Sequence, residues 1–432
     1  MMANFFVKEN KMLGEKHISF KHKSGLEVFV FPKKMTTSYA IFATRYGAID
    51  NKFKLEGEDK FTEVPDGIAH FLEHKLFECE GGIDAFELFA KTGASANAYT
   101  SNTMTGYLFS CTEKFYESLE ILLDFVTHPY FTEKTVQKEQ GIIAQEIKMY
   151  EDNPGARLHK ELMKALYKEN KIRIDVAGTV ESIAEINAEI LYKCYNTFYN
   201  LNNMCLAICG DVDAYEVEKV CDKILKDAPL QKIIRAYVEN GEPKEVYQKR
   251  AYANLDVAKP IFAIGVKMSD IPSTGNERLK MAYAMEILDE ILFSQSTAFY
   301  NELYTQNLIS QDLSSGCELT KHYCFNVISS ESSNPEEVYN RFVSYIEETK
   351  KSGIDKEAFE LSKRTIYSSN IKSFDSTDDI SNNFIFNHFD DADMLDAPEM
   401  IDEIDLDYVT RLLNECFKEE YYAMSIVNPI EA

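Results

Sequence analysis

Hydrophobic and polar residues alternate in short stretches of the chain, whereas in other stretches hydrophobic residues recur at helical spacing. Residues 26–31 alternate with a period of two and predict a strand, and residues 38–48 predict a second one. Residues 94–100 and 105–111 predict two paired strands joined by a polar turn. Helical spacing predicts helices over residues 115–127, 133–150, 156–169, 190–198 and 217–226.

The second half of the chain faintly repeats this order of elements. Residues 354–359 and the helix after them resemble residues 131–150, and residues 421–427 resemble residues 204–209. A long helical region is predicted over residues 277–306. We therefore expect an α+β fold of two homologous halves, each an antiparallel β-sheet covered by α-helices.

A polar stretch separates the two halves. A chain of 432 residues is expected to form two domains. Residues 229–249 are polar and include Pro229, Gly241 and Pro243, which is typical of a linker. The predicted domains are therefore residues 1–228 and residues 250–432.

His70, Glu73 and His74 form a His-x-x-Glu-His motif, and Pro65 is expected in the first turn of its helix. On a helix the two histidines stand one turn apart on one face, so both imidazoles can reach one cation. Glu73 lies on nearly the same side and can contact a water on that cation. Two imidazoles and a carboxylate suit Zn²⁺ with an open position for water. The alternative is a helix with two unrelated surface histidines.

A pair of glutamates downstream offers further ligands. Glu139 and Glu146 are seven residues apart, so they share one face of the predicted helix. One carboxylate can bind the metal while the other accepts a hydrogen bond from a ligating imidazole. The alternative is an ordinary amphipathic helix with a solvated glutamate face. The second half offers no such set, because its counterpart of the motif helix, near residues 285–294, contains no histidine.

These motifs and their order resemble the pitrilysin/insulinase-type metallopeptidases, which include mitochondrial processing peptidase. That family joins His-x-x-Glu-His to a glutamate some seventy residues on, with another glutamate seven residues earlier, and Glu146 lies 146 − 74 = 72 residues after His74. Further family-like segments follow in the same order. They are residues 97–100, 105–107, 128–131, 177–183, 203–204 and 210–212.

The resemblance implies a role for each candidate residue. His70, His74 and Glu146 would bind one Zn²⁺ per chain, and Glu73 would act as the general base. Glu139 would orient a ligating histidine. Peptide substrates would add a strand to the family's active-site edge strand, and its candidate contacts are Asn97, Ala98 and Tyr99. The alternative for these three residues is an ordinary internal strand.

The chain departs from the family at one point. Active members carry an Arg and a Tyr in the second half that steady the substrate carbonyl. Here Tyr304 and approximately Ser310 occupy those positions, and no arginine lies between Arg278 and Arg341. The resemblance therefore implies the catalytic subunit of a heterodimer with a homologous chain that lacks the zinc motif, or else a homodimer. The rival reading is a non-catalytic scaffold or peptide-binding subunit, but scaffolds lose ligands that this chain keeps.

Composition narrows the classes of function. The net charge of −25 argues against nucleic-acid binding and would attract basic peptides. No apolar run approaches eighteen residues, so no transmembrane helix is expected, and the first eleven residues are too polar for a signal peptide. Nine scattered cysteines without a Cys-x-x-Cys pair predict reduced thiols and a cytoplasmic protein.

Overall fold

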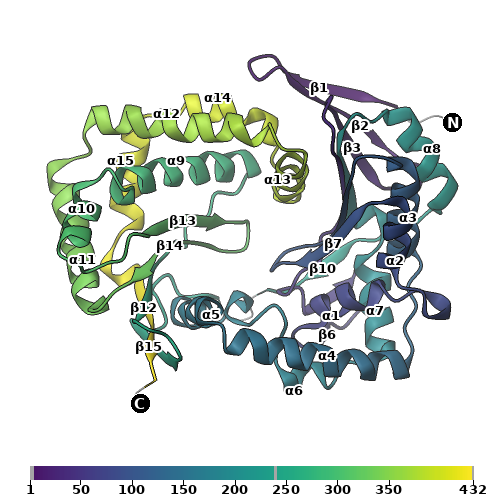
Figure 1. The fold of residues 1–432 in the computed structure, drawn as a ribbon, viewed down its shortest axis with the longest axis horizontal. Coiled ribbons are helices and arrows are strands. Elements are labelled where there is room, and N and C mark those ends of the chain that lie inside the picture. Colours follow the sequence, from purple (N-terminus) through teal and green to yellow (C-terminus); the bar gives the residue numbers. More distant parts are fainter. Residues whose placement is uncertain (1–3, 238–240, 431–432) are drawn as a thin grey trace.

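The structure is a computed structural model that describes residues 4–237 and 241–430, and Figure 1 shows two lobes, each built on one sheet. The first sheet has the strand order β1-β2-β3-β9-β4-β8-β7, and the second has the order β11-β15-β12-β14-β13. The strands of the first sheet are β1 (Phe6–Asn10), β2 (Glu15–Lys21), β3 (Glu27–Pro32), β4 (Ser38–Thr44), β7 (Ser95–Thr100), β8 (Thr105–Cys111) and β9 (Met204–Gly210). Those of the second are β11 (Arg250–Leu255), β12 (Ile261–Lys267), β13 (Ser314–Leu319), β14 (Cys324–Glu331) and β15 (Tyr422–Pro429).

The two sheets repeat one topology, which confirms the predicted α+β fold of two similar halves. Five strands in each sheet follow in the same spatial order, with β3-β9-β4-β8-β7 matched by β11-β15-β12-β14-β13. The prediction of wholly antiparallel sheets is wrong, because β3 pairs with β9 and β11 pairs with β15 in parallel. In each half the last strand returns after a long helical crossover, and such a crossover is what a parallel pair requires.

Helices fill the crossovers. Those of the first half are α1 (Ile68–Leu76), α2 (Ala85–Thr92), α3 (Phe115–Thr127), α4 (Glu133–Glu151), α5 (Pro154–Leu166), α6 (Val180–Ile183), α7 (Ala188–Phe198) and α8 (Ala214–Ile224). Those of the second half are α9 (Gly275–Phe293), α10 (Ala298–Thr305), α11 (Pro335–Ser352), α12 (Lys356–Ser373), α13 (Thr377–Phe389), α14 (Ala397–Asp402) and α15 (Leu406–Cys416). Single 3₁₀ turns occupy Glu80–Gly82, Lys171–Arg173, Leu201–Asn203, Met394–Asp396 and Glu419–Tyr421.

The motif helix and the long helical region of the second half differ from their predictions. The motif helix α1 begins at Ile68 rather than at Pro65, because Gly67 at its N-cap has a left-handed φ of 89°. A Cβ at Gly67 would lie 2.4 Å from the carbonyl oxygen of Ala177, so this close approach requires glycine. The helical region predicted over residues 277–306 is two helices, and Thr297 caps the second by accepting from the backbone N–H of Tyr300.

Each sheet is covered on one face by a helix from the other half of the sequence. Helix α5 packs on β11, β12 and β15, and Leu162 and Leu166 close over Gly265 there. Helix α13 packs on β4 and β9, where Ile380 and Phe384 join the core of the first sheet. Figure 1 shows both helices between the lobes. Because α5 packs on the second sheet and α13 on the first, buried apolar surface holds the two halves together.

The predicted linker is partly structured. A third, small sheet has the order β10-β5-β6, and its strands are β5 (Lys52–Leu55), β6 (Thr62–Glu63) and β10 (Ile233–Arg235). The linker therefore contributes a strand to the first lobe, while its positions 238–240 lie outside the described residues. The domain boundaries stay a prediction. None of the helices in the described residues is long and apolar enough to cross a membrane.

Candidate metal centre

Helix α1 presents the His-x-x-Glu-His residues on one side. Its other side, which includes Ile68, Phe71 and Leu72, is buried in the core of the first lobe and anchors the helix. The half-buried rings of His70 and His74 lie with their centroids 4.6 Å apart, as their one-turn separation predicts.

Helix α4 brings Glu146 to the two histidines. Nε2 of His70 lies 3.7 Å from Oε1 of Glu146, and Nε2 of His74 lies 3.4 Å from Oε2 of Glu146. Within the described residues these three side chains form the group able to hold a metal ion, with ligand atoms all within 4.8 Å of one another. Ligands about 2.0–2.1 Å from a tetrahedral Zn²⁺ stand roughly 3.4 Å apart, so the donor set fits zinc.

Glu139 holds the ring of His74 in this orientation. Nδ1 of His74 lies 3.1 Å from Oε1 of Glu139, which leaves Nε2 directed at Glu146. This is the carboxylate–histidine arrangement that fixes a ligand's tautomer. Nδ1 of His70, by contrast, is buried and has no hydrogen-bond partner in the described structure.

The two histidines differ in their electrostatics. Burial, together with the neighbouring His74, lowers the pKa of His70 to about 4, so His70 is neutral as a metal ligand must be. Burial also opposes protonation of His74, but the hydrogen bond to Glu139 and the charge of Glu146 outweigh it and raise its pKa. A cation on the histidines would therefore compete with a proton mainly at His74.

Glu73 lies beside this group, is only 9% exposed, and is held by Thr100. The Thr100 hydroxyl donates to Oε2 of Glu73 at 2.6 Å, and burial raises the pKa of this carboxyl. Sequence reasoning missed Thr100 as a site residue, although it ends the family-like segment 97–100. The Thr100 contact joins α1 to β7, so only the folded chain shows it.

The strand β7 lies at the edge of the first sheet, and not inside it as an ordinary internal strand would. Asn97 and Ala98 line a hollow of about 410 Å³ together with Glu73 and His74. Tyr99 points to the opposite face, where its hydroxyl donates to Oδ1 of Asn382 on α13 at 3.1 Å. The structure therefore brings Asn97 and Ala98 to the candidate site but directs the Tyr99 side chain away from it.

A second hollow also borders the candidate metal ligands. It measures about 270 Å³ and is lined by His70 and Glu146 together with apolar residues that include Met163, Ile172 and Ile174. Sequence reasoning did not find these residues, because they come from segments that meet α1 only in the folded chain. The candidate ligands thus border two separate hollows.

The structure does not bring Tyr304 or Ser310 to this site. Tyr304 lies on α10, at the far end of the molecule from α1 in Figure 1, and its ring stacks on Tyr300 at 5.8 Å. The backbone N–H of Ser310 donates to the carbonyl oxygen of Glu331 in the second lobe. Neither residue can therefore steady a substrate at the metal group of its own chain.

Comparisons with known proteins show which family the chain belongs to. Residues 61–180 match the family model described as "Insulinase (Peptidase family M16)", and residues 185–366 match the one described as "Peptidase M16 inactive domain". The chain is 40% identical over 413 residues to "Uncharacterized zinc protease YmfH" of Bacillus subtilis (strain 168), covering 94% of this chain and 95% of that one. The chain belongs to the M16 peptidase family. The resemblance to pitrilysin/insulinase-type metallopeptidases is thereby confirmed.

Solved structures of the M16 family share this architecture. An M16-like peptidase from Alicyclobacillus acidocaldarius is 33% identical, with a TM-score of 0.91 and full coverage of both chains. Pitrilysin is 15% identical with a TM-score of 0.76, a likeness that shows the fold alone. The match covers 100% of this chain and 47% of the pitrilysin chain. Relatives named zinc proteases support a peptidase and make zinc the metal to test. The motif residues lie in the stretch matched by the insulinase model, outside the one named inactive.

Proposed function

We propose that this M16 protein is a zinc-dependent endopeptidase that cleaves peptides or unfolded segments. The observation that carries the proposal is the gathering of His70, His74 and Glu146 around one point, with Glu73 beside them. One Zn²⁺ per chain would occupy that point. The named zinc proteases among the relatives support the same reading.

The residues around the metal have distinct tasks in this proposal. Bound zinc would polarise the scissile carbonyl and make water a better nucleophile near neutral pH. Glu73 accepts a proton from the attacking water and passes one to the leaving amine, since its raised pKa suits exchange in both directions. Thr100 holds the Glu73 carboxylate in place, and Glu139 keeps Nε2 of His74 facing Glu146.

The edge strand β7 would bind the substrate. A peptide added as a further strand would hydrogen-bond to the backbone of Asn97, Ala98 and Tyr99. Because the Tyr99 side chain points to α13, its share of the contact is limited to the backbone. Backbone pairing makes few demands on sequence, so broad selectivity for extended, unfolded segments is expected.

We further propose that a second chain completes the site. Tyr304 lies far from the metal group, and no arginine lies between Arg278 and Arg341. The chain matches about half of pitrilysin, which supports a dimer as the unit comparable with that longer protein. A homologous partner lacking the zinc motif would supply the missing Arg and Tyr, and a homodimer is the alternative. Preorganised donors of this kind typically contribute about 3–4 kcal/mol to transition-state binding.

The proposed compartment is the cytoplasm. The nine cysteines are free thiols, and six of them are buried in the cores of the two lobes. Buried free thiols without a disulfide suit a reducing environment.

A non-catalytic scaffold or peptide-binding subunit is the second candidate. Residues 185–366 match a domain named inactive, and this match favours a non-catalytic role for that stretch alone. Turnover separates the two candidates: the purified chain, alone and with a homologue that carries the Arg and Tyr, is incubated with unfolded peptides and the fragments are identified by mass spectrometry. Cleavage that requires zinc supports the peptidase, and intact peptides in both mixtures support the scaffold.

Metal content tests the ligand set independently of turnover. Elemental analysis should find one zinc per chain, and Glu146→Gln should lose it. Glu151→Gln is the matched control, because Glu151 is exposed on the same helix and contacts no ligand. Full zinc retention by the Glu146 variant would remove this residue from the ligand set.

A further inference from the structure

A small hollow lies where the two lobes meet, and three cations, Arg45, Arg235 and Lys321, are among the residues that line it. Its walls come from the turn between β7 and β8, the turn between β13 and β14, the end of α13 and strand β10. The side chains of Arg45, Arg235, Lys321 and His322 line a space of about 70 Å³. Such a cluster is unexpected in a chain with a net charge of −25.

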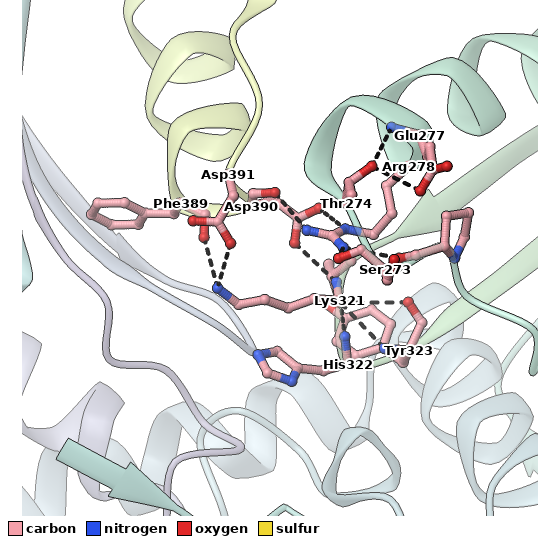
Figure 2. Close-up of polar contacts among 12 residues, drawn as sticks. Ser273, Thr274, Glu277, Arg278, Lys321, His322, Tyr323, Phe389, Asp390 and Asp391 are labelled. Atoms are coloured by element: carbon pink, nitrogen blue, oxygen red, sulfur yellow. Dashed lines mark hydrogen bonds and ion pairs between the residues drawn. The ribbon is translucent and has the colours of Figure 1, made fainter.

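The acidic residues of this hollow are already neutralised. Nε of Arg235 lies 2.8 Å from Oδ1 of the buried Asp50. Asp390 pairs at 2.5 Å with Nε of Arg278, which is itself buried and also donates to the carbonyl oxygens of Pro272 and Ser273, as Figure 2 shows. In each of these two ion pairs the positive and negative charges cancel. The net charge of the hollow is therefore set by the remaining cations, Arg45 and Lys321.

Arg45 is the cation without a carboxylate. Its guanidinium lies 4.4 Å from the centroid of the Phe389 ring, and in the described part of the chain no carboxylate oxygen comes within 4.0 Å of it. The half-buried guanidinium is therefore only partly compensated, by a ring face and by the longer-range charge of Glu27.

Lys321 and His322 extend from the turn between β13 and β14 to the same side, as Figure 2 shows. Nζ of Lys321 donates to the carbonyl oxygen of Phe389 at 3.1 Å and lies 3.6 Å from the exposed carboxylate of Asp391. The His322 ring packs on Tyr237 at 4.0 Å, and its nitrogens have no partner among residues 4–237 and 241–430. Burial, together with the charges of Lys321 and Arg235, lowers the pKa of His322 to about 3.

We propose that this hollow binds one carboxylate or phosphate group, held by Arg45, Lys321 and His322. A neutral His322 offers one N–H as donor, and the two cations offer charge-assisted hydrogen bonds. The volume of about 70 Å³ is small beside the hollows of about 270 and 410 Å³ at the candidate metal ligands, so it suits a single anionic group.

The group has two possible sources. One is a free small anion, and this source is independent of the proposed peptidase. The other is an acidic residue of a bound peptide, which rests on the proposed function. Thr103, in the turn that follows β7, lines the hollow. The hollow therefore lies just beyond Thr100, the last residue of β7. A peptide paired with β7 would thus reach it a few residues from the scissile bond.

The first experiment is calorimetric titration of the full chain with inorganic phosphate at constant ionic strength. We expect saturable binding that becomes roughly tenfold weaker in Arg45→Gln and in Lys321→Gln, since each variant removes one charge-assisted contact. The matched controls are Arg364→Gln and Lys34→Gln, which remove exposed charges elsewhere. Thermal unfolding of each variant reports folding, and Lys321→Gln is the safer substitution because Lys321 is exposed.

Equal phosphate affinity in wild type and both site variants, or the absence of saturable binding, would overturn the proposal. The ring of His322 provides a further readout, because a bound anion should raise its pKa and shift its proton resonances. Unchanged His322 resonances at saturating phosphate would also place the anion elsewhere.

The second experiment identifies the source. A peptide containing one Glu and its Gln twin compete with phosphate for the Glu73→Gln chain. Displacement of phosphate by the Glu peptide alone assigns the group to substrates. Phosphate binding that neither peptide disturbs assigns it to a free anion, and this result stands even if the chain proves not to cleave peptides.

Discussion

Each half of the chain holds a helix carboxylate against a strand of its sheet, but the two strands are not equivalent and the surroundings differ. In the first half, Glu73 on α1 accepts a hydrogen bond at 2.6 Å from Thr100 on the edge strand β7. In the second half, Asp289 on α9 accepts one at 2.6 Å from Asn326 on the neighbouring strand β14. Helix α9 occupies the place of α1, packed on the edge strand β13, but it contains no histidine.

The difference lies in what surrounds the carboxylate. Glu73 faces two histidines and a hollow of about 410 Å³, whereas Asp289 is 4% exposed and one of its oxygens has no partner in the described structure. Burial raises the pKa of Asp289 to about 8, so this carboxyl is neutral near pH 7. Helices in corresponding places thus carry carboxylates in different surroundings, one beside the candidate metal ligands and a hollow, the other enclosed in the core.

The largest expected effect separates these two carboxylates. Glu73→Gln should reduce peptide cleavage by roughly 10²–10⁴-fold, about 3–5 kcal/mol of barrier, because the general base is lost. Zinc content should stay at one per chain. Asp289→Asn should leave cleavage unchanged and serves as the control. The measurements are turnover of a fluorogenic peptide with the partner chain present and elemental analysis. Near-normal turnover by the Glu73 variant would exclude it as the base.

The second effect concerns stability and pH. The pKa of Asp289 is raised from 3.8 to about 8 in the folded chain, so from pH 4 to pH 8 only the unfolded state releases this proton. The free energy of unfolding should therefore fall across that window. Asp289→Asn should remove the fall and stabilise the chain at pH 8 by a few kcal/mol, at ~1.4 kcal/mol for each unit of pKa shift.

Denaturant titrations of wild type and Asp289→Asn at pH 4 and pH 8 measure this difference. Below pH 4 the carboxyl of Asp289 is protonated in both the folded and the unfolded state. The free energies of unfolding of wild type and Asp289→Asn should therefore differ there only by the effect of replacing a neutral acid with an amide. An equal difference at both pH values would mean that Asp289 is ionised in the folded chain.

A third, smaller effect tests how the histidine is oriented. Glu139→Gln should weaken zinc binding by 10–100-fold, because the side chain can still accept from Nδ1 of His74 but loses its charge. Competition with a chelator measures the affinity. Glu151→Gln, on the same helix, should bind zinc like wild type. If both variants matched wild type, the contact between Glu139 and His74 would be structural only.

The smallest effect tests the contact between Thr100 and Glu73. Thr100→Val keeps the shape of the side chain but removes the donor to Glu73, and cleavage should fall roughly tenfold, about 1.5 kcal/mol. Zinc content should not change, which separates a positioning role from loss of the metal. The control is Thr127→Val on α3. It also removes a hydroxyl, but this hydroxyl donates to the carbonyl oxygen of Leu123 and not to a residue of the candidate site.

Local patterns and the family resemblance predicted the candidate metal ligands, Glu73 and Glu139, but not Thr100. His70 and His74 had to share a helix face, and Glu139 and Glu146 had to share another, because helical spacing alone fixes these relations. The repeat of elements also predicted two similar halves. The comparisons confirm the family, while the roles of the individual residues stay proposals.

Contacts between segments distant in sequence needed the tertiary structure. The parallel pairing of β9 and β15, the exchange of α5 and α13 between the sheets, and the hydrogen bond from Thr100 to Glu73 all join such segments. So does the cationic hollow formed by Arg45 and Lys321 at the junction of the lobes. By itself the sequence determined which residues can share a helix or a strand, because that depends on backbone periodicity. Which helix covers which sheet, and which carboxylate meets a histidine, was decided only when the two halves packed together and buried their apolar faces.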